Sequence, residues 1–375
     1  MKFTKGCLKL EKKFVVFSLG FGVLEFGIRN LEFGIWNLES GIWNLESGIW
    51  NFKSGILNFE FFAKKGNLSF LNFLSLMRQI ILLLFFIWAL PFQAQERFID
   101  AVFKVEKPIT KTYANKEGEN LNLDIYQPKN DTLQARPVII FMHGGGFSGG
   151  MRTNEAEVKF AEAAAKKGYV AVQISYRLTR KGQSFGCDYE ASGKMQTFKM
   201  AAEDFLDAVK FMVDHKEEFR IDPSKIIVGG SSAGAEAVLI AVYNDKLMFD
   251  NFSAYENIDF AGIFSLAGAV VDARYITREN AVPGVFFHGT EDNLVPYGTG
   301  PHHWCKPGEP GYIMLDGSKT ITEKLRKLNT SFMLYSFEGG KHEHSGMPFE
   351  YFPEVFSFFK QVFLNGEKKQ IEVFK

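Results

Sequence analysis

The chain has 375 residues, of which 46% are hydrophobic, and it carries 43 basic and 43 acidic side chains. The formal net charge is therefore zero, which excludes the strongly basic composition typical of proteins that bind nucleic acid through a charged surface. The apolar fraction is that of an ordinary globular protein with a buried core.

Residues 24–58 form five consecutive seven-residue units, LEFGIRN, LEFGIWN, LESGIWN, LESGIWN and FKSGILN. A heptad repeat is typical of a coiled coil, but each unit carries a glycine, which costs about 1 kcal/mol inside a helix. The units are also shorter than solenoid repeats. We interpret residues 1–76 as a spurious or disordered extension, translated from a tandem DNA repeat, with a coiled coil as the alternative.

Residues 77–95 have the form of a secretory signal peptide. The basic start MRQ precedes an apolar stretch of eleven residues, IILLLFFIWAL, and the small residue Ala94 follows near a possible cleavage point. Eleven residues are too few to span a bilayer, which needs about 20. We expect export to the periplasm or beyond, with a mature chain that begins near Gln95 and is not inserted in the membrane. An uncleaved membrane anchor is the alternative.

From residue 121 onward, segments typical of strands alternate with segments typical of helices. Apolar and β-branched runs predict strands, and runs rich in Ala, Glu and Lys predict helices. The predicted strands are 121–126, 138–142, 169–176, 226–228, 261–265, 285–288 and 331–337, and the predicted helices are 154–167, 195–218, 235–242, 320–328 and 352–364. This alternation predicts one α/β domain, residues 96–375, with a mostly parallel sheet covered by helices on both faces.

The sequence His143-Gly144-Gly145-Gly146 directly follows the strand predicted at 138–142. Successive glycines leave backbone N–H groups uncovered and let the chain approach a substrate closely. Such donors can stabilise the oxyanion of an acyl-transfer intermediate, where each is worth roughly 2.7–4 kcal/mol. We predict that Gly145 and Gly146 supply donors and that His143 braces the loop. A flexible loop without function is the alternative.

Cys187 and Cys305 lie in two polar, glycine-rich connections of the predicted domain. After export we expect a disulfide between them, with two unpaired thiols as the alternative.

On the long predicted helix, Asp204 is expected either to pair with Arg177 as a structural brace or to lie on a solvated face.

The segment Gly230-Ser231-Ser232-Ala233-Gly234 fits the pattern G-x-S-x-G between a predicted strand and a predicted helix. This is the context of a nucleophile elbow, in which a serine hydroxyl is exposed on a sharp, strained turn. The glycines on either side let the strand and the helix approach each other. We therefore predict Ser232 as a nucleophile; a glycine-rich turn without chemistry is the alternative.

With the HGGG loop at 143–146 and the G-x-S-x-G turn at 230–234, the sequence resembles the α/β-hydrolase superfamily. The resemblance is to the serine carboxylesterases and lipases with an HGGG oxyanion loop, often called the hormone-sensitive-lipase-like group. The resemblance covers about residues 100–365. It implies an α/β-hydrolase fold and a catalytic triad in the chain order Ser, Asp or Glu, His. It also implies hydrolysis of carboxylic esters through an acyl-enzyme, with no cofactor and no metal ion.

By this resemblance, Asp292 is the triad acid, because it follows the strand predicted at 285–288 at the family's position, with Glu291 as its neighbour. His342 is the base, because it ends a glycine-rich loop after the last predicted strand. The backbone N–H of Ala233 is the third oxyanion donor.

His344 remains the alternative base, because a shift of two residues in the loop could present it instead of His342. A metal site formed by His342, Glu343 and His344 is a further alternative, although no other clustered ligands lie nearby in the sequence. The connections at 181–194 and 297–318 are expected to border the site and shape its pocket.

The sequence thus predicts a secreted serine carboxylesterase or lipase that acts on a small-molecule or polysaccharide-linked ester. Three alternatives remain. The protein could be an acetyl or feruloyl esterase acting on polysaccharides, or a peptidase of the prolyl-oligopeptidase type, although a propeller domain before the hydrolase domain has no room here. It could also be a non-catalytic binding protein with a hydrolase fold, although every chemical position is filled.

Overall fold

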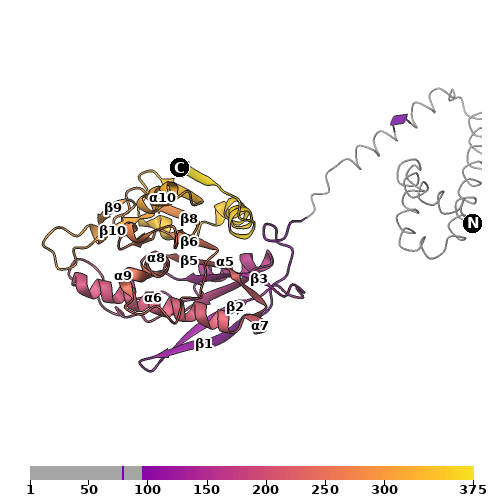
Figure 1. Cartoon of the computed structure of the whole chain (residues 1–375), viewed down its shortest axis with the longest axis horizontal. Helices are drawn as coiled ribbons and strands as arrows, with labels where there is room; N and C mark the ends of the chain where they lie inside the picture. Colours follow the sequence, from indigo (N-terminus) through magenta and orange to yellow (C-terminus); the bar gives the residue numbers. More distant parts are fainter. Residues whose placement is uncertain (1–77, 80–94) are drawn as a thin grey trace, which may run out of the picture. The chain divides into compact units, whose positions relative to one another are not determined.

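The computed structural model describes residues 78–79 and 95–375. The predicted extension at 1–76 lies outside these residues, and so does the predicted signal peptide apart from residues 78, 79 and 95. Ala94–Lys375 forms one compact unit (Figure 1). In the described part of the chain, no helix is both long enough and apolar enough to cross a membrane.

A nine-stranded sheet runs through this unit in the order β1-β2-β4-β3-β5-β6-β8-β11-β12. The pairs β1/β2 and β2/β4 are antiparallel, and the other pairs are parallel. The predicted mostly parallel sheet is therefore confirmed. The strands are β1 (Ile109–Lys116), β2 (Glu119–Tyr126), β3 (Arg136–Met142), β4 (Val170–Ile174), β5 (Ile221–Ser231), β6 (Gly262–Leu266), β8 (Gly284–Gly289), β11 (Phe332–Phe337) and β12 (Gln370–Phe374).

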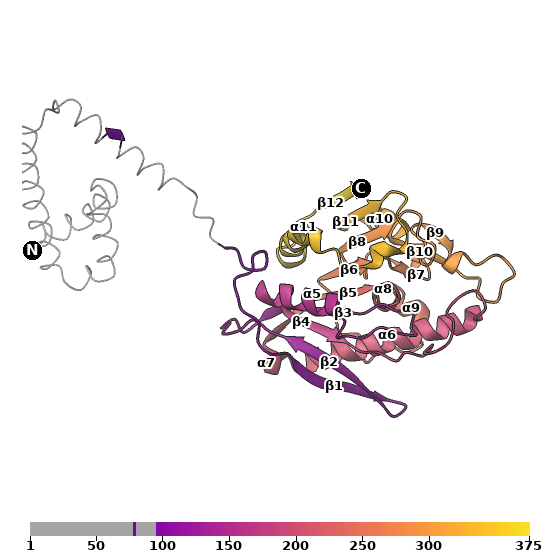
Figure 2. The same ribbon diagram turned by 180° about the vertical axis from the view of Figure 1, so that it is seen from behind.

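Helices cover both faces of the sheet (Figures 1 and 2). Because successive side chains of a strand point to opposite faces, β3 sends Val138 and Ile140 to one apolar cluster and Ile139 and Phe141 to the other. The first cluster includes α6 (Ala191–Asp214), α8 (Ala233–Tyr243) and α10 (Ser318–Lys327), and the second includes α5 (Glu155–Lys166), α11 (Phe352–Phe358) and the π-helical continuation η5 (Phe359–Leu364). Two further α-helices are short, α7 (Lys216–Phe219) and α9 (Asp245–Met248).

A smaller sheet has three strands in the order β7-β10-β9. Strands β9 and β10 lie in the long connection between β8 and α10, and β7 lies before β8. Its strands are β7 (Ala269–Val270), β9 (Thr299–Pro301) and β10 (Met314–Gly317). The expected disulfide joins Cys187 to Cys305, with the two Cα atoms 5.3 Å apart. The bridge ties this connection to the loop that precedes α6.

Arg177 and Asp204 form a buried ion pair between the end of β4 and α6. The Arg177 Nη2 atom lies 2.7 Å from Asp204 Oδ1, and the backbone N–H of Arg177 donates to Oδ2 at 2.8 Å. Asp204 is fully buried. Of the two alternatives for Asp204, the structure contains the structural brace.

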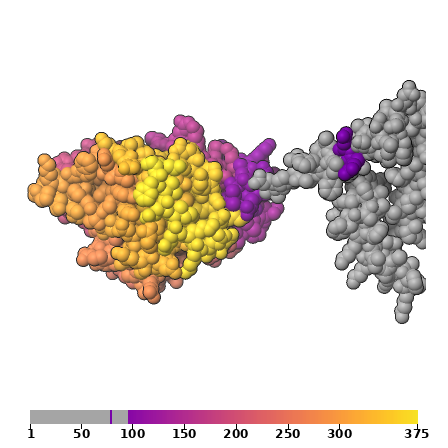
Figure 3. Space-filling view, turned by 90° about the horizontal axis from the view of Figure 1, so that it is seen from above, coloured from indigo at the N-terminus to yellow at the C-terminus, as the bar shows by residue number. Residues whose placement is uncertain are grey.

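Several elements differ from the sequence-based prediction, among them the strands β7, β9 and β10 of the smaller sheet, which were not predicted. Helix α6 begins at Ala191, four residues before the predicted start, and the predicted single helix is interrupted at His215, where α7 follows. Strands β1 and β12 were not predicted, because both lie at sheet edges and read as polar, partly exposed sequence. The C-terminal residues that include β12 form a continuous patch of the surface in Figure 3.

Candidate active site

Ser232 lies at the turn between β5 and α8, where its backbone takes φ 50° and ψ −123°. A positive φ is strained for a residue with a Cβ atom and is typical of functional turns. The Ser232 N–H donates to the carbonyl oxygen of Leu266 at 2.8 Å, which fixes the turn against β6. A Cβ atom at Gly230 would overlap the backbone of Gly234. The glycine at position 230 is therefore needed for the close approach of strand and helix.

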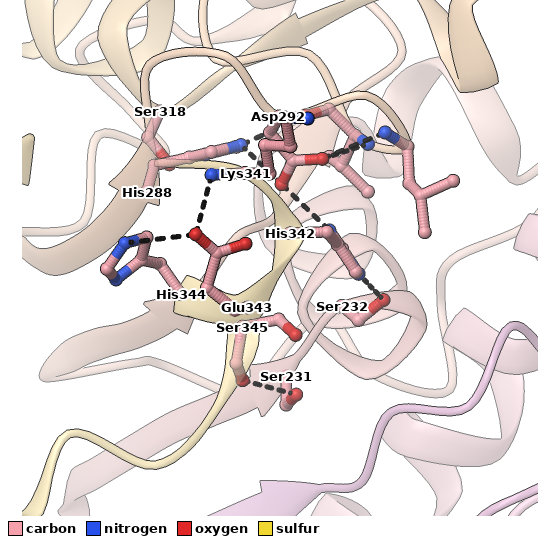
Figure 4. A network of polar contacts seen from close by, with 12 residues as sticks. Ser231, Ser232, His288, Asp292, Ser318, Lys341, His342, Glu343, His344 and Ser345 are labelled. Carbon is pink, nitrogen blue, oxygen red and sulfur yellow. Dashed lines mark hydrogen bonds and ion pairs between the residues drawn. The ribbon is translucent and has the colours of Figure 1, made fainter. Parts of the chain in front are cut away.

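Ser232, His342 and Asp292 lie in a line, although they are far apart in the sequence (Figure 4). The Oγ atom of Ser232 is 2.7 Å from His342 Nε2, and His342 Nδ1 is 2.7 Å from Asp292 Oδ2. The carboxylate accepts the proton on Nδ1, so the Nε2 lone pair faces the serine hydroxyl. This tautomer is the one in which the imidazole can remove a proton from Ser232.

Asp292 is buried near the start of the loop that follows β8. Its Oδ1 atom accepts backbone N–H bonds from Leu294 and Val295 at 2.9 and 3.0 Å. Its Oδ2 atom faces His342 and also His288 Nε2, at 3.4 Å. Burial raises the pKa of Asp292, but the hydrogen bonds from His288 and His342 outweigh it and hold the pKa well below its ordinary value. The carboxylate therefore stays ionised beside the imidazole.

The glycine loop after β3 packs directly against the elbow. A Cβ atom at Gly144 would lie 2.9 Å from the Ser231 carbonyl oxygen and 3.2 Å from Ser232 Cβ. Gly145 and Gly146 have φ values of 120° and 60°, which glycine adopts without strain. Their N–H groups have no acceptor among the described residues. Both glycines line the cavity beside Ser232, together with Ala233 at the start of α8.

His143 does not contact the serine hydroxyl but lies buried beneath this loop. Its Nδ1 atom is 2.7 Å from the Gly144 carbonyl oxygen, and its own carbonyl accepts the Tyr176 hydroxyl at 3.1 Å. Burial lowers the pKa of the imidazole, which is therefore neutral at pH 7. These contacts are those of a residue that braces the loop.

The structure separates His344 from Ser232 (Figure 4). Its ring stacks on Phe337 at a centroid distance of 3.8 Å, and its Nε2 atom lies 3.7 Å from a carboxylate oxygen of Glu343. Glu291, the neighbour of Asp292, is exposed. Of the two candidate bases, only His342 is in hydrogen-bond contact with the serine.

The predicted alternative of a metal site at His342, Glu343 and His344 has no support in the structure. Within residues 95–375, the one group of three potential ligands whose ligand atoms lie within 4.8 Å of one another is Cys187, Cys305 and Glu309. Both of these cysteines are consumed by the disulfide.

A cavity of about 460 Å³ opens beside Ser232. Phe185 and His303 come to it from the two loops that the disulfide joins, so these loops do shape the pocket. Glu157 and Glu236 add two carboxyl groups to its wall. Burial raises the pKa of both, for Glu236 to about 8, and burial lowers the pKa of His303 to about 3.

Sequence reasoning missed Glu236 and the contact of His288 with Asp292. A signal for Glu236 was present, because it is the single charged residue in the otherwise apolar helix AGAEAVLIAVY. A lone carboxyl group in a buried helix needs a reason, since unpaired charges are costly to bury. His288 stood in a strand that reads as apolar, and nothing in that pattern connects it with a residue four positions later.

Solved structures of esterase 2 from Thermogutta terrifontis have a similar fold. The native form matches with a TM-score of 0.51 and 19% sequence identity, over 69% of this chain and 95% of that chain. The form phosphorylated by paraoxon matches with a TM-score of 0.51 and 20% identity, over 68% and 93%. The chain has the α/β-hydrolase fold.

The BD-FAE family model matches residues 123–277 of the chain. That stretch contains the glycine loop and Ser232, whereas Asp292 and His342 lie beyond it. The family match therefore covers the serine half of the site. The acid and the base rest on the geometry described above.

Curated relatives of the chain include Gut esterase 1 of Caenorhabditis elegans, 31% identical over 34% of this chain and 21% of that protein. Secreted lipase 1 of Botryotinia fuckeliana is 28% identical, over 44% of this chain and 28% of that protein. Fumonisin B1 esterase of Sphingopyxis macrogoltabida is 34% identical, over 32% and 22%. The matched stretches thus span between a fifth and three tenths of the length of these relatives.

Proposed function

We propose that this protein is a serine carboxylesterase that hydrolyses carboxylic esters through an acyl-enzyme. The proposal rests on one observation, the line of two 2.7 Å contacts from Ser232 through His342 to Asp292. Relatives named as esterases and a lipase support the same reaction class.

In the proposed mechanism, His342 Nε2 takes the hydroxyl proton as Ser232 Oγ attacks the ester carbonyl carbon. Asp292 holds the imidazole in the required tautomer and stabilises the imidazolium that forms. The backbone N–H groups of Gly145, Gly146 and Ala233 donate to the oxyanion. The imidazolium then returns its proton to the leaving alcohol, and water attacks the acyl-enzyme with His342 again as the base.

The test compares wild-type protein with Ser232→Ala on p-nitrophenyl acetate and with a fluorophosphonate probe. We expect the substitution to lower turnover by about 10⁶-fold and to abolish labelling. Ser224→Ala, an exposed serine on β5, is the matched control and should retain both properties. A wild-type protein that neither reacts with the probe nor hydrolyses an ester would instead support a non-catalytic binding role.

We propose in addition that the protein is exported and that its mature chain begins near Gln95. The disulfide between Cys187 and Cys305 supports export, because such bridges persist in oxidising compartments. N-terminal sequencing of secreted protein tests this proposal. A secreted chain that retains the LESGIWN units would contradict it.

A polysaccharide-linked ester is the second candidate substrate, favoured by Trp304. This side chain is 59% exposed, and its Nε1 donates to the Asp292 carbonyl oxygen at 3.2 Å, so an aromatic surface lies beside the site. An exposed aromatic ring offers an apolar face on which a sugar ring can pack. We expect the wild-type protein to release acetate from acetylated xylan. Trp304→Ala should release less acetate from xylan but keep its turnover of p-nitrophenyl acetate.

A further inference from the structure

Glu236 occupies an unusual position next to the proposed nucleophile. It lies in the first turn of α8, and its backbone N–H donates to the Ser232 carbonyl oxygen at 2.9 Å. Helical side chains lean toward the N-terminus of their helix, so the carboxyl group leans toward Ser232. The residue is only 2% exposed, yet it lines the cavity beside Ser232.

The carboxyl group of Glu236 is incompletely paired. Its Oε1 atom lies 3.2 Å from His302 Nε2, but the two groups are not aligned for a hydrogen bond. In the described part of the chain, both atoms are buried without a hydrogen-bond partner. Buried polar atoms in native proteins almost always have a partner. The second carboxyl oxygen, Oε2, has no hydrogen bond within the described residues either and is not among these sealed atoms, so it is the oxygen that a group arriving with a ligand can reach.

His302 and Lys194 are two further buried polar groups next to this carboxyl group. Lys194 is fully buried and donates to the Gly311 carbonyl oxygen at 2.9 Å, while its Nζ lies 3.4 Å from His302 Nδ1. An ammonium group can only donate, so Nδ1 accepts and the imidazole proton resides on Nε2, facing Glu236. Lys194 comes from α6, His302 from the connection that follows β8, and Glu236 from α8. These three elements thus bring three polar side chains together at one place in the cavity wall.

The remaining lining shows what chemistry this spot suits. Asn154 and Glu157 contribute further polar groups, whereas Phe185 and Leu294 are apolar. An aliphatic chain in this cavity would displace water and leave the Glu236 carboxyl group unpaired. A hydroxyl group can pair with it in either protonation state, since it both donates and accepts. One helical turn, about 5.4 Å, separates Glu236 from Ser232, so the hydroxyl group belongs within a few bonds of the ester carbonyl.

We propose that Glu236 is a specificity-determining residue that hydrogen-bonds to a hydroxyl group carried by the ester substrate. The proposal rests on the esterase function proposed above. In this proposal, Glu236 selects hydroxylated esters over equally sized aliphatic esters. His302 and Lys194 position the carboxyl group of Glu236.

The experiment measures kcat/KM for two matched pairs of esters by titrating the released acid. Methyl 3-hydroxybutyrate and methyl 3-methylbutyrate differ by a hydroxyl group in place of a methyl group in the acyl part, and 2-hydroxyethyl butyrate and propyl butyrate differ in the same way in the alcohol part. We expect wild-type protein to prefer the hydroxylated member of one pair at least about tenfold. The pair that shows the preference identifies the part of the substrate that faces Glu236.

Two substitutions separate hydrogen bonding from packing. Glu236→Met keeps the side-chain length without a strong hydrogen-bonding group, and the preference should fall to about onefold. Glu236→Gln keeps the side-chain volume and part of the hydrogen-bonding capacity, so the ratio of kcat/KM for the hydroxylated over the aliphatic ester should be intermediate. This variant tests the proposal on its own if Glu236→Met does not fold. Glu155→Gln, an exposed glutamate of α5, is the control and should leave the wild-type ratio unchanged.

Distinct outcomes contradict distinct claims. A wild-type ratio near one in both pairs overturns the role of Glu236, and so does a ratio that stays at the wild-type value in both Glu236 variants, while the esterase function stands. Failure of the wild-type protein to hydrolyse any of the four esters overturns the proposed function, and the inference on Glu236 falls with it.

Discussion

The hydroxyl group of Ser231 donates a 2.7 Å hydrogen bond to the backbone carbonyl oxygen of Ser345 (Figure 4). This bond ties the elbow after β5 to the short 3₁₀ helix His342–Ser345, which carries the proposed base. We predict that Ser231→Ala lowers kcat up to about tenfold and the free energy of unfolding by about 1 kcal/mol. Ser224→Ala is the control, and an unchanged kcat in Ser231→Ala would show that the bond does not position His342.

The two histidines of this loop should differ sharply in their effect on turnover. We predict that His342→Ala lowers kcat on p-nitrophenyl acetate by about 10⁴-fold or more, because the proton acceptor is lost. His344→Ala should change kcat only a fewfold, because its ring stacks on Phe337. The opposite order of effects would assign the base to His344.

The lowered pKa of Asp292 predicts a specific dependence of stability on pH. An aspartate has a pKa of about 3.9 in the unfolded chain, and the folded value is lower because His288 and His342 donate to the carboxylate, despite its burial. The ionised group therefore stabilises the fold above pH 4, and this contribution is lost as the pH falls through the folded pKa.

Asp292→Asn lacks this contribution. We expect the difference in unfolding free energy between wild type and Asp292→Asn to be largest at neutral pH and to shrink below pH 4. Urea denaturation at several pH values measures it. A difference that grows on acidification would mean that the carboxyl group is protonated in the native protein.

The disulfide between Cys187 and Cys305 should affect both stability and substrate binding. It spans 118 residues of sequence, and bridges over such long loops stabilise proteins by about 2–5 kcal/mol. We predict a loss of this size in Cys187→Ser/Cys305→Ser, measured by urea unfolding. The KM for esters should rise as well, because Phe185 and His303 reach the cavity from the bridged loops. An unchanged KM would show that the loops hold their positions without the bridge.

The parts of the fold that surround the proposed triad were predictable because parallel strands leave a plain signal. The strands before His143, Ser232 and Asp292 are buried on both faces and therefore read as short apolar runs ended by glycine-rich turns. The G-x-S-x-G turn selected Ser232 as a candidate, and the resemblance to the HGGG esterases then selected Asp292 and His342 from the later turns.

The edges of the sheet and the wall of the cavity were not predictable in the same way. Strand β1, ITKTYANK, has no apolar run, because only backbone pairing with β2 makes it a strand. Lys194, Glu236 and His302 come from three separate segments, and Lys and Glu ordinarily indicate solvent exposure. The burial of Lys194 and His302 depends on tertiary packing, to which a linear sequence gives no local clue, whereas the apolar helix around Glu236 did carry a signal.

Gly234 determines how the two halves of the site meet. A Cβ atom there would overlap the carbonyl oxygens of Met142 and His143, so backbone presses on backbone where α8 crosses the end of β3. The distance between the glycine loop after β3 and Ser232 is consequently set by backbone–backbone contact, without a side chain that could change its rotamer. The spacing between the proposed oxyanion donors and the proposed nucleophile thus depends on the absence of a side chain at one residue that takes no part in the proposed chemistry.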